Sequence, residues 1–282
     1  MKLLSILLVC LIFSLAAAPV AGTAESAPRS NELSLLAINV GKGDALLLRC
    51  GSSCYLIDTG KKKQAETLIG ILEAEGISRL TGVIITHTDK DHMGGLKKLA
   101  NSGIMIDNVY SSAFCAEEDD VHPVEKALKD TGLDVTWLSG GNALPLDGGT
   151  LSVLGPLERD GEKENNNSLV LLAEGGGGSM LLAGDMEFPE ETSLLNAGLI
   201  PHADVLKIGN HGEDDATSNA FISAVKPSLA VISTNSDEEP DTPSPRVLKL
   251  LASYGIPVLV TQDASTGVLI TLKGGEISTE MK

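Results

Sequence analysis

GVIITHTDKDHMGGL, residues 82–96, is the stretch of this sequence that decides its fold. An apolar run typical of a buried strand leads into two histidines and two aspartates within six residues. Such a set is costly at a strand end unless a cation collects it, and imidazole and carboxylate groups are suitable ligands of first-row metals. We therefore expect a metal-binding loop, with a helix beginning after His92. The competing interpretation is a polar turn capped by Asp91, but a cap needs only one aspartate.

Two later segments repeat the pattern of an apolar strand that ends in a candidate ligand. MLLAGD, residues 180–185, ends in Asp185, and VLKIGNHG, residues 205–212, places His211 among small residues. Taken singly, a capping aspartate and a surface histidine are adequate interpretations. Three such strand ends in one chain instead predict a shared metal site, formed by His87, Asp89, Asp91, His92, Asp185 and His211.

Short apolar runs alternate with amphipathic stretches from residue 33 onward, and no linker divides the chain. Three expected strands come first, and helices and strands then alternate in two roughly similar halves. This order predicts an α/β (α+β) fold with two mixed sheets packed face to face and helices outside. Glycines 175–178 predict a tight hairpin, because a phosphate loop requires a strand-to-helix context. The expected strands span residues 33–39, 45–49, 55–58, 82–86, 108–111, 135–138, 151–154, 168–173, 179–183, 205–208, 229–232, 258–261 and 267–271, and the expected helices span 64–75, 93–100, 123–130, 189–197, 219–225 and 245–254.

The N-terminal residues indicate export. Lys2 precedes an apolar run over residues 3–18, which is shorter than the ~20 residues of a membrane span and is followed by small residues. We therefore expect a signal peptide over residues 1–24, a flexible lead-in over 25–32 and a folded domain over 33–282. Cleavage near residues 22–24 would give a secreted or extracytoplasmic protein. The alternative is a retained N-terminal membrane anchor.

The remainder of the chain is strongly acidic. Without Lys2, 20 basic residues stand against 38 acidic ones. This excess argues against broad binding to nucleic acid, and an aromatic content of 3% offers few surfaces on which bases can stack. This acidity does not exclude a short basic strip at one site, because five lysines lie near the candidate loops: Lys42, Lys61, Lys62, Lys63 and Lys90. Most of them are interpreted as ordinary solvated side chains.

Three cysteines remain after export, and two of them are close in sequence. LLLRCGSSCYLID, residues 46–58, predicts a hairpin that places Cys50 and Cys54 opposite each other, within reach of a disulfide in an oxidising compartment. Two reduced thiols are the alternative, and the residues alone do not decide between them. A zinc ribbon is not indicated, because no second cysteine pair follows.

Taken together, these motifs resemble the metallo-β-lactamase superfamily, which has a four-layer αββα sandwich fold. The resemblance rests on the segments THTDKDHMGG (86–95), LLAGD (181–185) and VLKIGNHG (205–212). The branch that the chain resembles most is the soluble domain attached to ComEC-type DNA-uptake proteins, over residues 33 to about 277. Its DVGQGDA, LIDTG and NxxSLVL segments are similar to NVGKGDA (39–45), LIDTG (56–60) and NNSLV (166–170).

The resemblance implies two divalent metal ions that activate a water molecule and polarise the substrate. Asp89 stands where the superfamily more often has histidine, and this extra oxygen ligand makes manganese a competitor of zinc. His87 and Asp91 would be the catalytic residues, and Asp58 would support the ligand loop. One metal would be bound by His87 and Asp89, the other by Asp91, His92 and His211, and Asp185 would bridge the two.

The chain departs from this branch at positions expected to face substrate. The branch usually has HHGS where this chain has Asn210 to Glu213, and GHP where it has Thr242 between Asp241 and Pro243. Our leading hypothesis is a secreted metal-dependent hydrolase of phosphoesters or phosphodiesters, in small molecules or nucleic acid. The alternatives are a hydrolase of a lactam, lactone or thioester, and a weakened metal-binding surface module. We expect no transmembrane channel in this chain.

Overall fold

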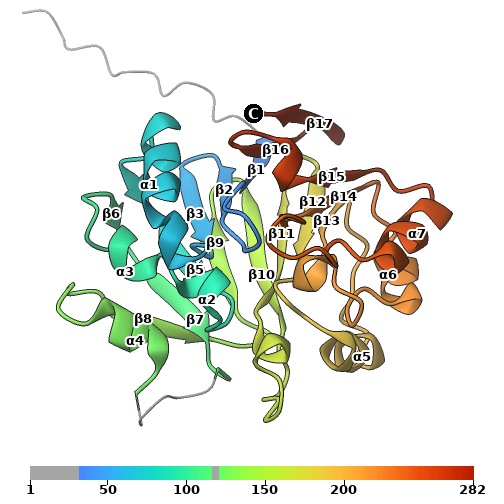
Figure 1. The fold of residues 1–282 in the computed structure, drawn as a ribbon, viewed down its shortest axis with the longest axis horizontal. Helices are drawn as coiled ribbons and strands as arrows, with labels where there is room; N and C mark the ends of the chain where they lie inside the picture. The colour runs from blue at the N-terminus through green and yellow to red at the C-terminus, as the bar shows by residue number, and fades with distance from the viewer. Residues whose placement is uncertain (1–31, 116–120) are drawn as a thin grey trace, which may run out of the picture.

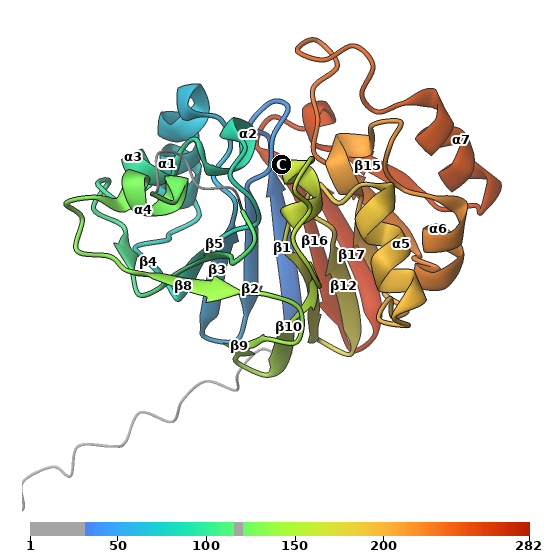
Figure 2. The same ribbon diagram turned by 90° about the horizontal axis from the view of Figure 1, so that it is seen from below.

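Two large sheets pack face to face, and helices cover the outer face of each (Figures 1 and 2). The computed structural model describes residues 32–115 and 121–282. The arrangement is the four-layer αββα sandwich expected from the sequence. The predicted signal peptide lies outside the described residues, as does the predicted lead-in up to residue 31. Within the described ranges, no helix has the length and apolar character needed to cross a bilayer.

The first sheet has eight strands and joins the two ends of the described chain. Its antiparallel part is β17-β16-β1-β2-β3, in which Glu32 of β1 pairs with Lys273 of β16, and its parallel part continues through β5, β7 and β8. The strands are β1 (Glu32–Ile38), β2 (Leu46–Cys50), β3 (Ser53–Ile57), β5 (Gly82–Ile85), β7 (Val109–Ser112), β8 (Val135–Leu138), β16 (Gly267–Lys273) and β17 (Glu276–Met281).

The second sheet has seven strands in the order β15-β14-β13-β12-β11-β10-β9. Strands β12 to β15 are parallel, and β9 to β12 are antiparallel. A separate two-stranded sheet pairs β4 (Arg79–Leu80) with β6 (Met105–Ile106). The strands of the second sheet are β9 (Ala143–Leu146), β10 (Gly149–Gly155), β11 (Val170–Gly175), β12 (Gly178–Leu182), β13 (Val205–Lys207), β14 (Leu229–Ile232) and β15 (Val258–Val260).

Helices α1 to α4 lie on the first sheet, and α5 to α7 lie on the second (Figure 2). Ser218 and Ser244 cap the last two helices, because each side-chain oxygen accepts a hydrogen bond from a backbone N–H of the first turn. The helices are α1 (Ala65–Ala74), α2 (Lys90–Met93), α3 (Leu96–Leu99), α4 (Pro123–Leu128), α5 (Phe188–Asn196), α6 (Asn219–Val225) and α7 (Pro245–Ser253).

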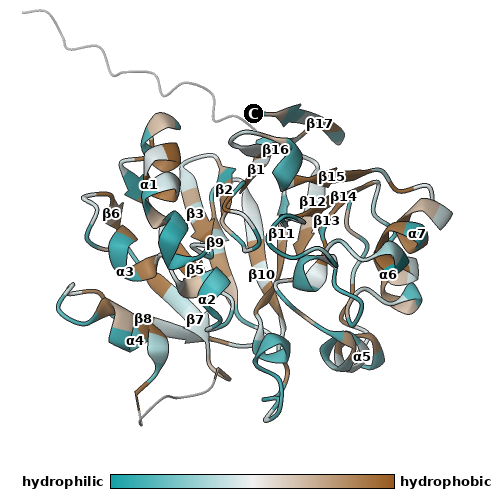
Figure 3. Ribbon diagram, viewed as in Figure 1, coloured by the Kyte–Doolittle hydropathy of each residue, from teal (hydrophilic) through white to brown (hydrophobic). Residues whose placement is uncertain are grey.

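Three apolar layers hold the sandwich together. Successive residues of a strand point to opposite faces, so Leu35 and Ala37 of β1 enter the layer between the sheets, while Leu36 and Ile38 face the helices. A third layer fills the space between the second sheet and α5 to α7. Figure 3 shows brown and white along the central strands, with teal on the loops and on the outer helices. Burial on both faces explains why these strands appear in the sequence as continuous apolar runs.

Each expected strand is present, with its ends within two residues of the prediction. The expected start of a helix after His92 is wrong: α2 begins at Lys90, and α2 and α3 are separated at Gly94 and Gly95. A Cβ at Gly94 would lie 2.3 Å from the Lys90 carbonyl oxygen, and one at Gly95 would lie 2.4 Å from the Thr59 oxygen. The ligand loop therefore packs too tightly at this point for any residue with a side chain.

Cys50 and Cys54 are free thiols, as in the second of the two predicted alternatives. The register of β2 and β3 pairs Cys50 with Ser53 and Arg49 with Cys54. The cysteines are therefore offset by one position, and a one-residue offset places side chains on opposite faces of a sheet. Cys50 lies in the layer between the sheets, and Cys54 packs against the helix-side layer. The expectation that they lie opposite each other is wrong.

Candidate metal centre

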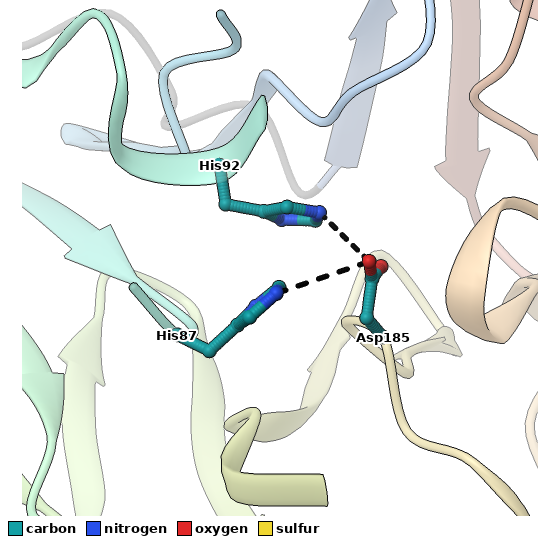
Figure 4. A group of neighbouring side chains, drawn as sticks. All are labelled: His87, His92 and Asp185. Carbon is teal, nitrogen blue, oxygen red and sulfur yellow. Dashed lines mark ion pairs between the residues drawn. The ribbon is translucent and has the colours of Figure 1, made fainter. Parts of the chain in front are cut away.

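Residues that follow three different strands meet at one end of the sandwich. His87 follows β5, His92 belongs to α2, Asp185 follows β12, and both imidazoles point toward the Asp185 carboxylate (Figure 4). His211 approaches the same carboxylate from the turn after β13. The parallel strands β5, β12 and β13 thus deliver these ligands at their carboxyl ends, where ligands of parallel sheets commonly bind.

The turn that carries His211 has an uncommon backbone. Asn210 and His211 have φ angles of 43° and 52°, in the left-handed region that residues other than glycine rarely adopt. Asn210 tolerates this conformation, and its side-chain amide donates a hydrogen bond of 3.0 Å to Asp215. Backbone outliers of this kind concentrate at functional sites. Here the turn directs the His211 ring back to the Asp185 carboxylate.

Three ligand atoms form a compact triangle. The Nε2 atoms of His92 and His211 lie 3.0 and 3.1 Å from Oδ2 of Asp185, and 3.2 Å from each other. Ligand atoms ~2.0–2.1 Å from a tetrahedral zinc ion are about 3.3 Å apart. The spacing therefore fits a metal ion. Asp91 lies beside this triangle, with its Oδ2 3.8 Å from Nε2 of His211.

The outer nitrogens of these two rings fix their orientation. Nδ1 of His211 donates to the Ser233 carbonyl oxygen at 2.7 Å, and Nδ1 of His92 lies 2.7 Å from Oδ2 of Asp58. A carbonyl can only accept, so the Nδ1 of His211 donates to Ser233, and its Nε2 is the ring nitrogen that faces Asp185. With Nδ1 of His92 likewise held by Asp58, the two Nε2 atoms face each other at 3.2 Å. A metal bound between them would displace the protons that these nitrogens carry without it.

His87 supplies a buried nitrogen that suits a metal. Its Nε2 has no hydrogen-bond partner among the described residues, and it lies 3.9 Å from Oδ2 of Asp185. Its Nδ1 is within 3.2 Å of the hydroxyls of Thr86 and Ser168. Burial, followed by the neighbouring charge of His92, lowers the pKa of His87 to about 3. The ring is therefore neutral, and its Nε2 lone pair is available to a metal.

The centre is electrostatically suited to a cation. Burial alone would lower the pKa of His92, yet Asp185 and Asp58 raise it well above the usual value. Burial would likewise raise the pKa of Asp185, but His211 and His92 hold it well below its usual range. The pKa of Asp91 is also lowered, because His92 and His211 outweigh its burial. Ionised carboxylates therefore surround the imidazoles and attract positive charge.

The structure brings five of the six predicted ligands together and places Asp89 at the edge. Asp89 has a side chain that is 50% exposed, and its Oδ2 lies 3.8 Å from Nε2 of His87. Among the described residues, the groups whose ligand atoms all lie within 4.8 Å of one another contain the other five residues but not Asp89. Metal binding by all six residues stays a prediction.

Two buried charged residues beneath the centre have no predicted role. The ammonium of Lys207 forms an ion pair with the Asp44 carboxylate, donates a hydrogen bond of 3.0 Å to the Gly184 carbonyl and lies 3.8 Å from Oδ1 of Asp185. Burial would lower the pKa of Lys207, but Asp44 and Asp185 raise it, so the lysine is charged. The available signal is a lysine inside the apolar strand VLKI, residues 205–208.

Ser168 and Glu164 also support the centre without having been predicted to do so. The Ser168 hydroxyl accepts the backbone N–H of Asp185 at 3.1 Å and also contacts His87. Glu164 accepts hydrogen bonds from the backbone and hydroxyl of Thr88, which lies between two predicted ligands. Both residues thus link the second half of the chain to the ligand loop of the first half.

Ion pairs between the two halves form the charged rim of the centre, which consists of Lys42, Lys61, Lys63, Glu213 and Glu238. Lys42 lies 2.5 Å from Glu213, and Lys61 and Lys63 lie 2.8 and 2.9 Å from Glu238. These three of the five lysines are therefore ion-paired and not simply solvated. Glu213 is one of the departures from the branch motifs, and in this chain it holds a lysine.

A cavity of about 550 Å³ opens beside the rim. The carboxylates of Glu213, Asp214, Glu239 and Asp241 line it, together with the side chain of Arg246. Thr242, another departure, also lines the cavity, but its hydroxyl is engaged with Thr234 at 2.6 Å. The cavity next to the candidate metal centre is therefore predominantly acidic.

The family model of the Metallo-beta-lactamase superfamily matches residues 38–236. "ComE operon protein 3" of Bacillus subtilis is 32% identical over 247 residues, which are 81% of this chain and 32% of that protein. "Competence protein ComA" of Neisseria gonorrhoeae is 29% identical over 236 residues, 82% of this chain and 31% of that protein. This chain thus spans about a third of the length of these two relatives. The metallo-beta-lactamase fold protein YhfI from Bacillus subtilis superposes with a TM-score of 0.56 at 14% identity, covering 86% of this chain and all of that one.

Proposed function

The chain belongs to the metallo-beta-lactamase superfamily, and on this premise we propose that it is a hydrolase that uses two divalent metal ions, zinc or manganese. The observation that carries the proposal is the convergence of three imidazole Nε2 atoms on the single carboxylate of Asp185. The buried Nε2 of His87, which has no partner in the part of the chain that the structure describes, supports it, because such an atom is costly unless something binds it.

The residues divide into two groups of ligands. His87 and Asp89 would hold one ion, and Asp91, His92 and His211 would hold the other, with Asp185 shared between them. When bound, the metals would lower the pKa of a water molecule and polarise the substrate. Asp91 is ionised and has a side chain that is 21% exposed, so it can hold and orient this water through a hydrogen bond.

We propose phosphoester or phosphodiester bonds as the target, in a small molecule or in nucleic acid. The similarity to two competence proteins supports a phosphodiester, although the chain covers only a third of each. The acidic composition favours a short or small substrate over extended nucleic acid. We further propose that the protein acts outside the cytoplasm after removal of the N-terminal residues 1–24.

A lactam, lactone or thioester is the second candidate for the bond that is cleaved. The observation in its favour is the acidic cavity lined by Glu213, Asp214, Glu239 and Asp241. Four carboxylates against a single arginine, Arg246, give this cavity a negative charge that repels a polyanion but not a neutral carbonyl compound. A substrate with one negative charge would be repelled less than a polyanion and more than a neutral compound.

The test is metal-dependent hydrolysis of bis(p-nitrophenyl) phosphate by residues 25–282, loaded separately with manganese and zinc. Metal content is measured on the same samples, and Asp91→Ala is the matched inactive control. We expect turnover that requires metal and is lost in the control. Two bound metals without turnover, combined with hydrolysis of a chromogenic lactam or thioester, would support the second candidate. Absence of bound metal would contradict both.

A further inference from the structure

Lys42 lies at the mouth of the candidate metal centre because its loop is attached to the ligand loop. The backbone N–H of Asp44 donates to the Asp91 carbonyl oxygen at 3.2 Å. A Cβ at Gly43 would lie 2.6 Å from the same oxygen, so the two loops are in direct contact. Lys42 is therefore one residue from a glycine that packs against a predicted ligand. Its side chain is 15% exposed, which leaves the ammonium partly accessible.

Three other described lysines near the centre have partners of their own, whereas Lys90, within the ligand loop, is exposed. Lys207 is fully buried and held by Asp44 and the Gly184 carbonyl. Lys61 and Lys63 both form ion pairs with Glu238. Lys42 differs from Lys90 because its ammonium is held in place, 2.5 Å from Glu213, on a loop that contacts Asp91. It is thus an ordered cation that can meet a negative charge on a substrate.

Glu213 holds the Lys42 ammonium but can release it. The carboxylate is 2.5 Å from Nζ of Lys42, and its side chain is 32% exposed. Ion pairs in contact with solvent contribute little to stability, so exchanging one anionic partner for another costs little. Glu239, 4.0 Å from the same ammonium, is a weaker second partner. The position of the lysine is therefore maintained while its hydrogen bonds can be exchanged.

We propose that Lys42 binds the anionic oxygen of the substrate, and that Glu213 holds its ammonium in place until the substrate displaces the carboxylate. The inference rests on the proposed function, because it assigns a partner to the charge of a phosphodiester. Lys42 and Glu213 both stand where the resembled motifs have uncharged residues, glutamine in DVGQGDA and serine in HHGS. The two changes together introduce a cation at the mouth and the carboxylate that holds it.

The test compares Lys42→Gln, Glu213→Gln and the control Lys61→Gln, all in metal-loaded protein. The dissociation constant of inorganic phosphate is measured by calorimetry, and KM and kcat are measured with bis(p-nitrophenyl) phosphate. Lys42→Gln should weaken phosphate binding and raise KM about tenfold, since it removes a charge-assisted hydrogen bond, while kcat changes little. Glu213→Gln should tighten phosphate binding and lower KM. Lys61→Gln, which breaks a neighbouring ion pair, should change neither.

Opposite shifts in the two variants are the signature, because a purely structural ion pair would be damaged equally from either side. Shifts in the same direction, or no shift in either variant, would overturn the inference. If phosphate binding shifts as expected but no diester is hydrolysed, the proposed function fails and the role of Lys42 stands. If diesters are hydrolysed but KM and phosphate affinity are unchanged in Lys42→Gln and Glu213→Gln, the proposed function stands and the role of Lys42 fails. Thermal unfolding of each variant checks that it is folded.

Discussion

The floor of the centre and its charged rim are both built from opposite charges, yet they differ in burial. The floor consists of Asp44, Asp58, His92, Asp185 and Lys207, whose side chains are at most 5% exposed. The paired side chains of the rim are 15–60% exposed. Removing one partner of a buried pair leaves an uncompensated charge, whereas water replaces the lost partner of an exposed pair. The floor therefore fixes the geometry of the centre, and the rim can exchange partners.

The largest effect is expected on the floor, for Lys207→Met. The change leaves the Asp44 carboxylate buried without its cation, which should lower the free energy of unfolding by about 3–5 kcal/mol. Urea denaturation measures the loss. The double variant Lys207→Met with Asp44→Asn should recover a large part of it, because the unpaired charge is then absent. A loss below about 1 kcal/mol, as is typical of exposed pairs, would remove the distinction between floor and rim.

Next in size is the support that Asp58 gives to His92. Asp58→Asn should lower metal affinity about 10–100-fold, because the carboxylate orients the ring and raises its basicity. Competition with a chromophoric chelator measures this affinity without requiring turnover. Asp107→Asn serves as the control, since Asp107 pairs with the exposed Arg79. Equal affinities in both variants would show that the floor does not act on the metal.

Glu190 extends the comparison to a buried carboxyl that lacks a cation. Its oxygens have no hydrogen-bond partner among the described residues, and burial, then Glu191 and Asp160, raise its pKa well above the usual 4.5. The folded state thus retains a proton that the unfolded state releases above about pH 4.5, and stability falls as pH rises from there toward the folded pKa. The free energy of unfolding of Glu190→Gln should therefore increase relative to that of the native chain as pH rises, by at most about 1.4 kcal/mol per pH unit. Thermal unfolding between pH 4 and 8 tests this, and a constant difference would contradict it.

The smallest effect is expected at the rim, for Glu238→Gln. This change breaks the ion pairs to Lys61 and Lys63 but should lower the free energy of unfolding by only about 0.2–1 kcal/mol. The loss should shrink in 1 M salt, which screens exposed charges. Urea denaturation at two salt concentrations measures both quantities. A loss comparable to that of Lys207→Met would show that the rim is as structural as the floor.

The ligands of the centre could be predicted from the sequence, whereas the charged pairs of the floor and the rim could not. Ligands such as His87 and Asp185 were predictable because each ends a continuous apolar strand, and both features are local. The pairing of Lys207 with Asp44 was not, because the two residues are far apart in sequence and meet only after the two sheets pack. The rim pairs were missed for the same reason.

Two errors of the fold prediction also have physical causes. Strands β4, β6, β9 and β17 were not predicted. Strand β17 is mostly exposed, so EISTEM lacks the continuous apolar run that identified the predicted strands. The cysteine hairpin was predicted correctly, but its register was not, because a shift of one residue leaves the hydrophobic pattern around Cys50 and Cys54 almost unchanged. Register depends on the turn, and Gly51 adopts a left-handed φ of 55° there.

The position of β16 has a consequence for how the chain reaches its native state. This strand lies beside β1, so the first sheet closes only when residues 267–273 have been synthesised and have docked. Pairings over such sequence separation raise the contact order and slow folding. Until then, the side of β1 that β16 will cover is an open edge, which can pair with other chains. During synthesis, the ligand loop at residues 86–95 is therefore present before the first sheet can be completed. The sheet is completed only when the C-terminal strand β16 pairs with β1.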